Sequence, residues 1–426
     1  MESLLSRSKY NGTDLNIWVT LDESAAIEAA HHSETILNTG GPIGPLHGIP
    51  IGIKDIFYTK GVRTTACSPI YNDFVPEYDA TTVDLLKKSG AIIMGKTITT
   101  QFACSDPSPT LNPWNHAHTP GGSSSGSAAG VAARIFPAAL GSQTAGSVLR
   151  PASYNGVVGF KPTFGRISRY GVVPVAYTLD TMGTFARSVE DTALILDVLA
   201  GYDHNDPWSS ENPTHNYQKA LLDPKSPPRI GLISKFFYDK SDDEVVTHTD
   251  VVAQKLRQSG ALVEQVSISK DFNDLLHAHQ IIMSVEAALT HQKDFKTHPN
   301  AYAPNIRDLI ETGMSTSSTA YANAQKTRHH FRVALEEIAQ KFDVLLTPST
   351  KSTAPKDLTT TGDPIFQTPW TVCGFPAISL PSGLGRAGLP LGIQLASIPF
   401  SEASLLTTSK WCEEIINFDL EPPNQN

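Results

Sequence analysis

The chain has 426 residues, of which 40% are hydrophobic and 18% charged, and its 33 Lys and Arg against 42 Asp and Glu give a formal net charge of −9. These proportions are ordinary for a folded globular protein with a large core, and the lack of basic clusters argues against a nucleic-acid-binding or anionic-membrane-binding surface. No run approaches 18 apolar residues, and the first residues lack the apolar segment of a signal peptide, which predicts a cytoplasmic protein without a membrane span.

The cysteines and histidines do not form metal-binding patterns. The four cysteines (Cys67, Cys104, Cys373 and Cys412) are widely spaced and form no CxxC, so we expect reduced thiols. The fourteen histidines include the triplets HAH at 116–118 and 277–279, but none has the H-E-x-x-H spacing. We therefore expect neither a metal site nor a cofactor.

The first elements predict a helix followed by a strand. Residues 20–38 have the pattern of an amphipathic helix, with Thr20 or Asp22 as its N-cap. A turn rich in Gly and Pro then leads into a short apolar strand at 49–53, which Lys54 closes. Taken alone, a lysine at a strand end is most often a residue whose amine reaches water.

The next segment predicts a helix, a strand and a long loop. Residues 79–90 are expected to form a helix that stops at Gly90, and 91–94 a buried strand. The loop at 105–120 is rich in Pro and Asn and leads directly into the serine-rich turn around Ser123. Since long ordered loops beside a rigid scaffold commonly carry binding residues, we expect this loop to line the entrance to a site.

Two turns of small residues, GGSSSGS at 121–127 and SQTAGS at 142–147, bracket a short apolar segment. Ser123 and Ser147 lie among Gly and Ala, where a ligand can approach the backbone closely. Such a serine could act as a nucleophile, with neighbouring N–H groups directed at a developing oxyanion. The stretch is too short, and too closely followed by an alanine-rich segment, to be a flexible linker, and it matches neither glycine motif of nucleotide sites.

The remaining chain alternates helices and strands. Residues 188–191 form a capping box that opens a helix, and 203–228 are polar and proline-bearing, as expected for a surface excursion. A strand–helix–strand unit at 229–268 favours a parallel sheet; 271–341 are mostly helical, 342–350 and 375–383 are late strands, and 402–416 a final helix. This order predicts one α/β domain over 1–426, with a mixed, largely parallel twisted β-sheet covered by helices on both faces.

The serine-rich block resembles the signature of a known enzyme family. GGSSSGSAAGVAA followed by LGSQTAGSVLRPASYNGVVGFKPTFGRISRYGV is similar to the amidase signature family, and GIPIGIKD at 48–55 is similar to that family's lysine segment. The resemblance runs from about Trp18 to the last helix, is densest over about 45–200 and is weakest over 203–330. It is closest in character to stand-alone malonamidase-like amidases, and it implies the amidase signature fold.

The resemblance also implies a Ser–cis-Ser–Lys mechanism. Ser147 would attack an amide carbonyl, Ser123 would relay its proton to an uncharged Lys54, and water would hydrolyse the acyl-enzyme. The peptide bond before Ser123 is expected to be cis. A lysine base must have a pKa well below ~10.4, which burial beside isoleucines could provide. The oxyanion hole would consist of the backbone N–H groups of Thr144, Ala145, Gly146 and Ser147.

Three further residues are candidates for binding substrate: Gly122, Gln143 and Arg150. Arg150 is either a structural anchor, in a salt bridge or holding a loop, or a bidentate clamp for a substrate carboxylate. Gln143 and Ala145 replace the Asp and Gly of the commonest family pattern, which argues against the amidotransferase subunit used in tRNA charging. Successive strand side chains alternate, so Asp55 is expected to face away from Lys54 and to bind loop amides.

The function expected is hydrolysis of a small or medium carboxamide to a carboxylate and ammonia or an amine, with a small-molecule amide as the substrate and neither nucleic acid nor membrane as a partner. The region 203–330 and the loop 105–120 are expected to shape the substrate pocket. Two alternatives stay open: a glutamine-dependent amidotransferase subunit, and a catalytically silent interaction protein. The resemblance is compatible with a homo-oligomer, for which the sequence carries no local mark.

Overall fold

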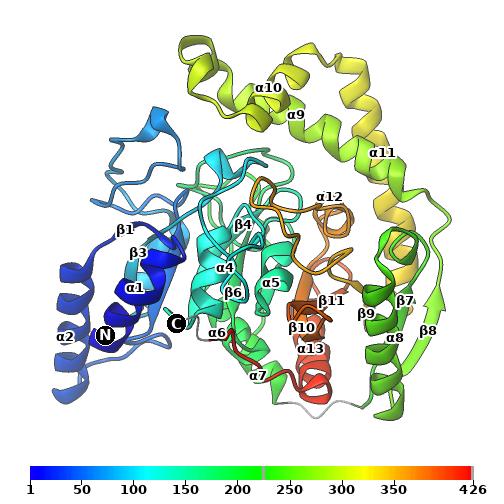
Figure 1. Ribbon diagram of the computed structural model, residues 1–426, viewed down its shortest axis with the longest axis horizontal. Coiled ribbons are helices and arrows are strands. Elements are labelled where there is room, and N and C mark those ends of the chain that lie inside the picture. Colours follow the sequence, from blue (N-terminus) through cyan, green and yellow to red (C-terminus); the bar gives the residue numbers. More distant parts are fainter. Residues whose placement is uncertain (223–225, 424–426) are drawn as a thin grey trace.

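A computed structural model describes residues 1–222 and 226–423 (Figure 1). Over these residues, eleven strands form one sheet in the order β1-β3-β2-β4-β6-β5-β10-β11-β9-β7-β8. The strands are β1 (Trp18–Leu21), β2 (Pro50–Lys54), β3 (Ile92–Thr97), β4 (Ala138–Gln143), β5 (Val158–Lys161), β6 (Thr181–Ala186), β7 (Arg229–Ile233), β8 (Leu262–Val266), β9 (Val344–Pro348), β10 (Ala377–Leu384) and β11 (Pro390–Ala396). The helices are α1 (Glu2–Asp14), α2 (Glu23–Asn38), α3 (Thr81–Lys88), α4 (Ser125–Ala132), α5 (Leu149–Asn155), α6 (Val189–Leu199), α7 (Tyr217–Leu221), α8 (Asp243–Gln258), α9 (Phe272–Thr297), α10 (Pro304–Ser315), α11 (Ser318–Ala339), α12 (Thr368–Val372) and α13 (Glu402–Ile416).

The expected α/β domain with one mixed sheet is confirmed, but the sheet is less parallel than predicted. Among the described strands, four pairings are parallel: β2 with β3, β2 with β4, β7 with β8, and β7 with β9. The other six are antiparallel and include the whole centre, from β4 through β6, β5, β10 and β11 to β9. "Largely parallel" was therefore wrong, because the strands β5, β6 and β11 were not foreseen.

The core lies on both faces of the sheet, as the alternation of β4 shows. Ala138 and Leu140 belong to the larger cluster of buried side chains, which includes residues of α3, α6 and α13. Ala139, on the opposite face, belongs to the smaller cluster with α4 and Phe136. Successive strand side chains point to opposite faces, so helices cover the sheet from both sides, as predicted.

The glycines of α4 let this helix approach the sheet closely. A Cβ on Gly126 would lie 2.5 Å from the carbonyl oxygen of Ile17 and 2.7 Å from the amide nitrogen of Ile98. A Cβ on Gly130 would lie 2.2 Å from the ring of Phe136. These distances are too short for a side chain, so the packing of α4 requires glycine at positions 126 and 130.

Most of the predicted elements are present. Asp22 caps α2 by accepting a hydrogen bond from the amide of Ala25, and Ser188 caps α6. The strand–helix–strand unit at 229–268 is found as β7, α8 and β8 with parallel strands. The final helix matches 402–416. Helix α1 was not predicted, and part of the expected surface excursion, 223–225, lies outside the described residues, as do the last three residues of the predicted domain.

Helices α9, α10 and α11 form an arm at one end of the molecule (top right in Figure 1). Two side chains from the loop after β3 bind its backbone. Gln101 donates to the carbonyl oxygen of Ala301 and accepts from the amide of Ala303, and Asp106 accepts from the amides of Asn305 and Ile306 at the start of α10. The arm is therefore attached to the segment that precedes Ser123.

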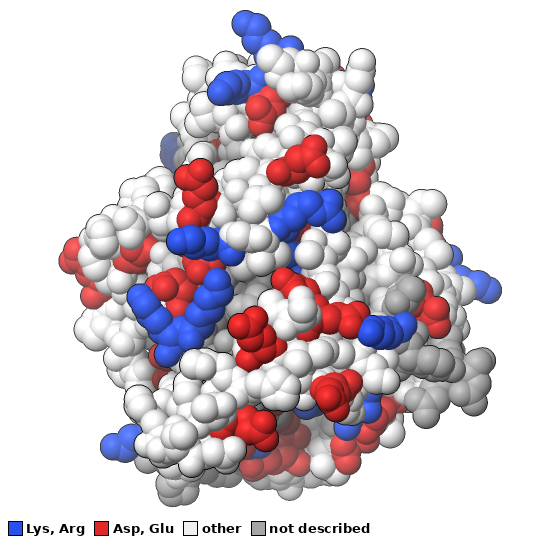
Figure 2. All heavy atoms as spheres, turned by 90° about the vertical axis from the view of Figure 1, so that its left-hand side faces the viewer, with Lys and Arg blue, Asp and Glu red and all other residues white. Residues whose placement is uncertain are grey.

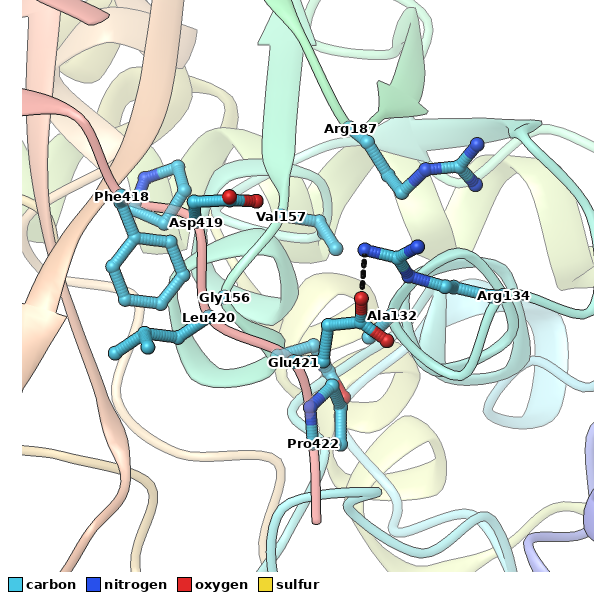
Figure 3. A pocket seen from close by; sticks show the side chains of 12 residues that line it. Ala132, Arg134, Gly156, Val157, Arg187, Phe418, Asp419, Leu420, Glu421 and Pro422 are labelled. Carbon is cyan, nitrogen blue, oxygen red and sulfur yellow. Dashed lines mark ion pairs between the residues drawn. The ribbon is translucent and has the colours of Figure 1, made fainter. Parts of the chain in front are cut away.

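The C-terminal segment lies beside the C-terminal ends of α4 and α5. Glu421 pairs with Arg134 at 2.5 Å, beside a small pocket of about 80 Å³ that Phe418 and Leu420 also line (Figure 3). On the face shown in Figure 2, acidic and basic side chains are interspersed. No helix among the described residues is long and apolar enough to cross a membrane.

Candidate active site

The side chain of Lys54 lies between two serine hydroxyls. β2 carries Lys54 at its carboxyl end, and the side chain is fully buried. Its amine donates to the hydroxyl oxygen of Ser123 at 2.7 Å and to that of Ser142, on β4, at 2.8 Å. The expectation for an isolated strand-end lysine, an amine in water, is therefore wrong. Ser142 was not singled out from the sequence, because it lies in the SQTAGS turn, in which Ser147 was the expected nucleophile.

Burial lowers the pKa of Lys54 to about 7, and the nearby carboxylate of Asp180 only partly opposes this effect. Removing an ammonium group from water disfavours its charged form, and the two hydroxyls around it are neutral. No ion pair joins this amine to a carboxylate in the described part of the chain. A large fraction of Lys54 is therefore uncharged near neutral pH, as a proton acceptor requires.

Ser123 and Ser147 come from separate turns. The Gly122–Ser123 peptide bond is cis, and the Ser123 side chain is buried. Ser147 precedes α5 and lines a cavity of about 210 Å³. Among the hydrogen bonds of the described residues, none joins the hydroxyl of Ser123 to that of Ser147. Of the expected relay, the structure therefore contains the hydrogen bond between Lys54 and Ser123 but not the one between Ser123 and Ser147.

The turn at 144–147 leaves its backbone donors unused. None of the amides of Thr144, Ala145, Gly146 and Ser147 donates to an acceptor among the described residues. The next two amides are occupied, because the side-chain oxygen of Gln143 accepts from Val148 at 2.9 Å and from Leu149 at 3.0 Å. Gln143 also donates to Thr371 and is fully buried. Its amide thus holds the turn and does not line the cavity, unlike the substrate-binding role expected.

Three more side chains hold the same turn from outside. The hydroxyl of Thr144 donates to Asp180 at 2.5 Å, and the carbonyl oxygen of Thr144 lies 2.9 Å from the Nε2 of His279, on α9. The hydroxyl of Thr371 donates to the carbonyl oxygen of Ala145 at 2.7 Å. Burial lowers the pKa of His279 to about 4, so this histidine is neutral and its Nε2 donates to the carbonyl.

Arg150 anchors the backbone on both sides of the cavity. One guanidinium nitrogen donates to the carbonyl oxygen of Gly362 at 2.8 Å, and another to that of Gly122 at 2.7 Å and to the hydroxyl of Thr361. The side chain is 4% exposed, and it forms no ion pair among the described residues. The sequence left two roles open for Arg150, a structural anchor and a clamp for a substrate carboxylate. Its hydrogen bonds to two backbone carbonyls correspond to the anchor. Gly122 has no room for a side chain, since a Cβ would lie 2.8 Å from Thr361.

Asp55 points away from Lys54, as predicted. It accepts hydrogen bonds from the amide and the hydroxyl of Thr65 at 2.9 and 2.6 Å, and it lies 3.5 Å from the amine of Lys96, which is also buried. The expected binding of a loop amide is confirmed. Asp55 therefore holds the loop at 64–67 beside the candidate site and leaves Lys54 without a charged partner.

The cavity at Ser147 has mostly neutral polar walls. It is lined by Ala103, Cys104, Ser105, Thr144, Ala145, Ser147, Arg150, Met283, Asn305, Thr359, Thr360, Thr361, Gly362 and Pro364. Met283 and Asn305 come from the region 203–330, as expected. Of the loop 105–120 only Ser105 lines the cavity, so most of that prediction was wrong. The wall at 359–364 was missed, because nothing in its sequence distinguishes it from an ordinary loop.

Comparison with known proteins places these residues in a family. A family model described as Amidase matches residues 1–406. A glutamyl-tRNA(Gln) amidotransferase subunit of Geobacter sp. (strain M21) is 35% identical, over 96% of this chain and 91% of its own. Two solved structures cover nearly the whole chain. Peptide amidase from Stenotrophomonas maltophilia has 27% identity and a TM-score of 0.87, covering 100% of this chain and 94% of its own. A complex described as revealing the origins of an s-triazine catabolic enzyme has 29% identity and a TM-score of 0.91, covering 97% and 93%.

Proposed function

Because the chain belongs to the amidase family, we propose that it is an amidohydrolase that cleaves a small, uncharged carboxamide to a carboxylate and ammonia or an amine. The observation that carries the proposal is the buried amine of Lys54, with a pKa near 7, 2.7 Å from the hydroxyl of Ser123 and without a carboxylate partner. A lysine in this state is suited to general-base catalysis, and its position suits a relay through Ser123 to Ser147.

The first half of the reaction forms an acyl-enzyme. Substrate in the cavity brings the hydroxyls of Ser123 and Ser147 into contact, since catalytic hydrogen bonds often tighten only in the substrate complex. The proton of Ser147 passes to Ser123, the proton of Ser123 passes to Lys54, and the Ser147 oxygen bonds to the amide carbon. The proton then returns through Ser123 to the substrate nitrogen, the C–N bond breaks, and ammonia or an amine leaves.

The second half uses water as the nucleophile. The same relay takes a proton from water as its oxygen bonds to the acyl carbon, and the proton returns to Ser147 as the ester bond breaks. In both halves a negative charge develops on the carbonyl oxygen. The unused amides at 144–147 are the candidate donors to this oxyanion, and each such donor is worth on the order of 3 kcal/mol.

The walls of the cavity favour an uncharged substrate. Arg150 is the one charged residue that lines it among the described residues, and the terminal guanidinium nitrogens already bind the backbone at Gly122 and Gly362. The other polar side chains are hydroxyls, the thiol of Cys104 and the amide of Asn305. A free amino acid such as glutamine carries two charges, and burying each without a partner is costly.

A panel of amides tests this proposal. Ammonia release is measured for propionamide and benzamide, for the acidic amide malonamate, and for glutamine. We expect turnover of the uncharged amides, little turnover of malonamate or glutamine, and none by a Ser147→Ala variant. Preference for malonamate would contradict the uncharged substrate. Failure of Ser147 to react with a fluorophosphonate probe in folded protein would contradict the hydrolase itself.

A second candidate function follows from the relatives named as amidotransferase subunits, one of which is 35% identical over 96% of the chain. Under this alternative, the protein would release ammonia from glutamine for use by a partner protein. The two candidates differ in a direct measurement. Glutamine hydrolysis that is absent in the isolated chain and appears with a co-purified partner would favour the amidotransferase, and turnover of simple amides by the isolated chain would favour the amidohydrolase.

A further inference from the structure

A second cavity, of about 250 Å³, is lined by Asp180, the residue that binds the side chain of Thr144. Its lining comes from 169–182 and 205–208 and includes Arg169, Tyr170, Tyr177, Asp180, Met182 and Trp208. Asp180 accepts the hydroxyl hydrogen bond of Thr144, and Thr144 lines the cavity at Ser147. A single hydrogen bond therefore separates this second cavity from the candidate active site.

Aromatic rings are concentrated at this opening. Five tyrosine or tryptophan side chains in the described part of the chain are exposed by more than a third: Tyr78, Tyr170, Tyr177, Tyr202 and Trp208. Tyr170, Tyr177 and Trp208 line the cavity, and Tyr78 stacks on Tyr170 with ring centroids 5.4 Å apart. Exposed apolar groups gathered at one hollow mark a binding site more often than isolated ones. Aromatic walls bind flat rings well.

The charged groups at this cavity already have partners. Arg169 donates to both carboxylate oxygens of Asp206, at 2.8 and 3.1 Å. Asp180 accepts from Thr144 on one oxygen and from the amides of Val175 and Ala176 on the other. A charged ligand would find no unpaired group of opposite charge there. The ligand that fits is uncharged.

We propose that this cavity is a second binding site, for an uncharged planar aromatic or heteroaromatic molecule, and that its occupation is transmitted to the turn at 144–147 through Asp180 and Thr144. A cavity of about 150 Å³ holds benzene, so about 250 Å³ has room for two fused rings. A ring over Asp180 excludes water and strengthens the bond to Thr144. The transmission rests on the proposed function of Ser147, whereas the binding site does not.

Binding is tested with indole as the probe, by calorimetry and by saturation-transfer NMR on the intact chain. We expect saturable binding that Trp208→Ala and Tyr177→Ala each weaken about tenfold, the effect of losing one stacking ring. Tyr202→Ala removes an exposed ring that does not line the cavity and should leave the affinity unchanged. All three side chains are exposed, so the variants should keep the melting temperature of the parent chain. Cyclohexanol, which is apolar but not planar, should bind far more weakly.

Transmission is tested by the rate at which a small fluorophosphonate labels Ser147. Saturating indole should accelerate labelling about fivefold, and Trp208→Ala should abolish the acceleration. Indole binding that is insensitive to Trp208→Ala and Tyr177→Ala, or absent, would overturn the site. Binding without a change in labelling would overturn the transmission. If Ser147 is not labelled even without indole, the proposed function fails, and the calorimetry alone still decides whether the site exists.

Discussion

The amine of Lys54 is 2.7 Å from the hydroxyl oxygen of Ser123 and 2.8 Å from that of Ser142, so its nearest partners are two neutral groups. An amine in this position gains little from being charged, and burial lowers its pKa to about 7. The proposed chemistry depends on this balance, and the following predictions test it and the groups around it.

The first prediction concerns pH. Because the lowered pKa of Lys54 is about 7, its amine carries a proton below that pH and cannot accept one. The value of kcat/KM for an uncharged amide should therefore rise with pH through about 7 and level off above it. Ammonia release between pH 5 and 9, with circular dichroism at each pH to confirm folding, checks this. A profile that falls with rising pH across the same interval would exclude Lys54 as the base.

The second prediction concerns Ser142. The hydroxyl of Ser142 accepts from Lys54 and favours its charged form, so Ser142→Ala should lower the pKa of Lys54 further. A hydrogen bond to a charged donor is worth about 1 kcal/mol more than a neutral one, which corresponds to about 0.7 pKa units. The rising limb of the pH profile should move to lower pH by that amount. Ser127→Ala is the matched control, because Ser127 is a buried serine that bonds Thr97 and Leu140 instead.

The third prediction concerns His279 as a positioning residue for the turn at 144–147. His279→Leu leaves the carbonyl oxygen of Thr144 without its side-chain donor, at a cost of about 1–3 kcal/mol, and should lower kcat about tenfold or more with little change in KM. His279→Gln, whose amide can donate from a similar position, should recover most of the loss. His277→Leu, on the exposed side of α9, should have no effect. An unaltered kcat in His279→Leu would remove this role.

The fourth prediction concerns Arg150. Lysine cannot reproduce two separate donations from a planar guanidinium, so Arg150→Lys should loosen the connection between Gly122 and Gly362. Activity should fall by the same factor on uncharged and acidic amides, and the free energy of unfolding should fall by about 2–4 kcal/mol. Parallel kinetics with propionamide and malonamate, together with urea unfolding, check this. A loss of activity on malonamate alone would instead favour Arg150 as a clamp for a substrate carboxylate.

The sequence named Lys54, Ser123 and Ser147 as catalytic candidates, and the structure joins the first two by a hydrogen bond. Lys54, Ser123 and Ser147 were recognisable because each lies in a short segment with a distinctive pattern. Burial of Lys54 was expected only because a lysine base requires it, and Ser142 as a second acceptor for its amine was not foreseen. His279 had a usable signal: four residues after Leu275 and three before Ile282, it falls on the buried stripe of α9, whereas the HAH triplet drew attention only as a metal motif.

The strands of the fold were also predicted only where the sequence has a distinctive pattern. The unit β7–α8–β8 was predicted correctly, because its strands are apolar runs separated by a complete helix. The strands β5 and β6 were missed. They are short, and each contains a glycine, Gly159 in β5 and Gly183 in β6, at a position where close packing leaves no room for a side chain. Without them, the antiparallel centre of the sheet could not be foreseen.

Helices α9 and α10 of the arm line the cavity, and α9 also supports the turn at 144–147. This double role constrains how the protein can be re-engineered. Met283 and Asn305 form part of the wall of the cavity at Ser147, while His279, one turn before Met283, holds the backbone proposed to bind the oxyanion. Grafting these helices from a relative to change selectivity would also replace that brace. Any chimaera that keeps the parent's turnover should therefore retain a hydrogen-bond donor at position 279, and libraries directed at new substrates should leave that position fixed.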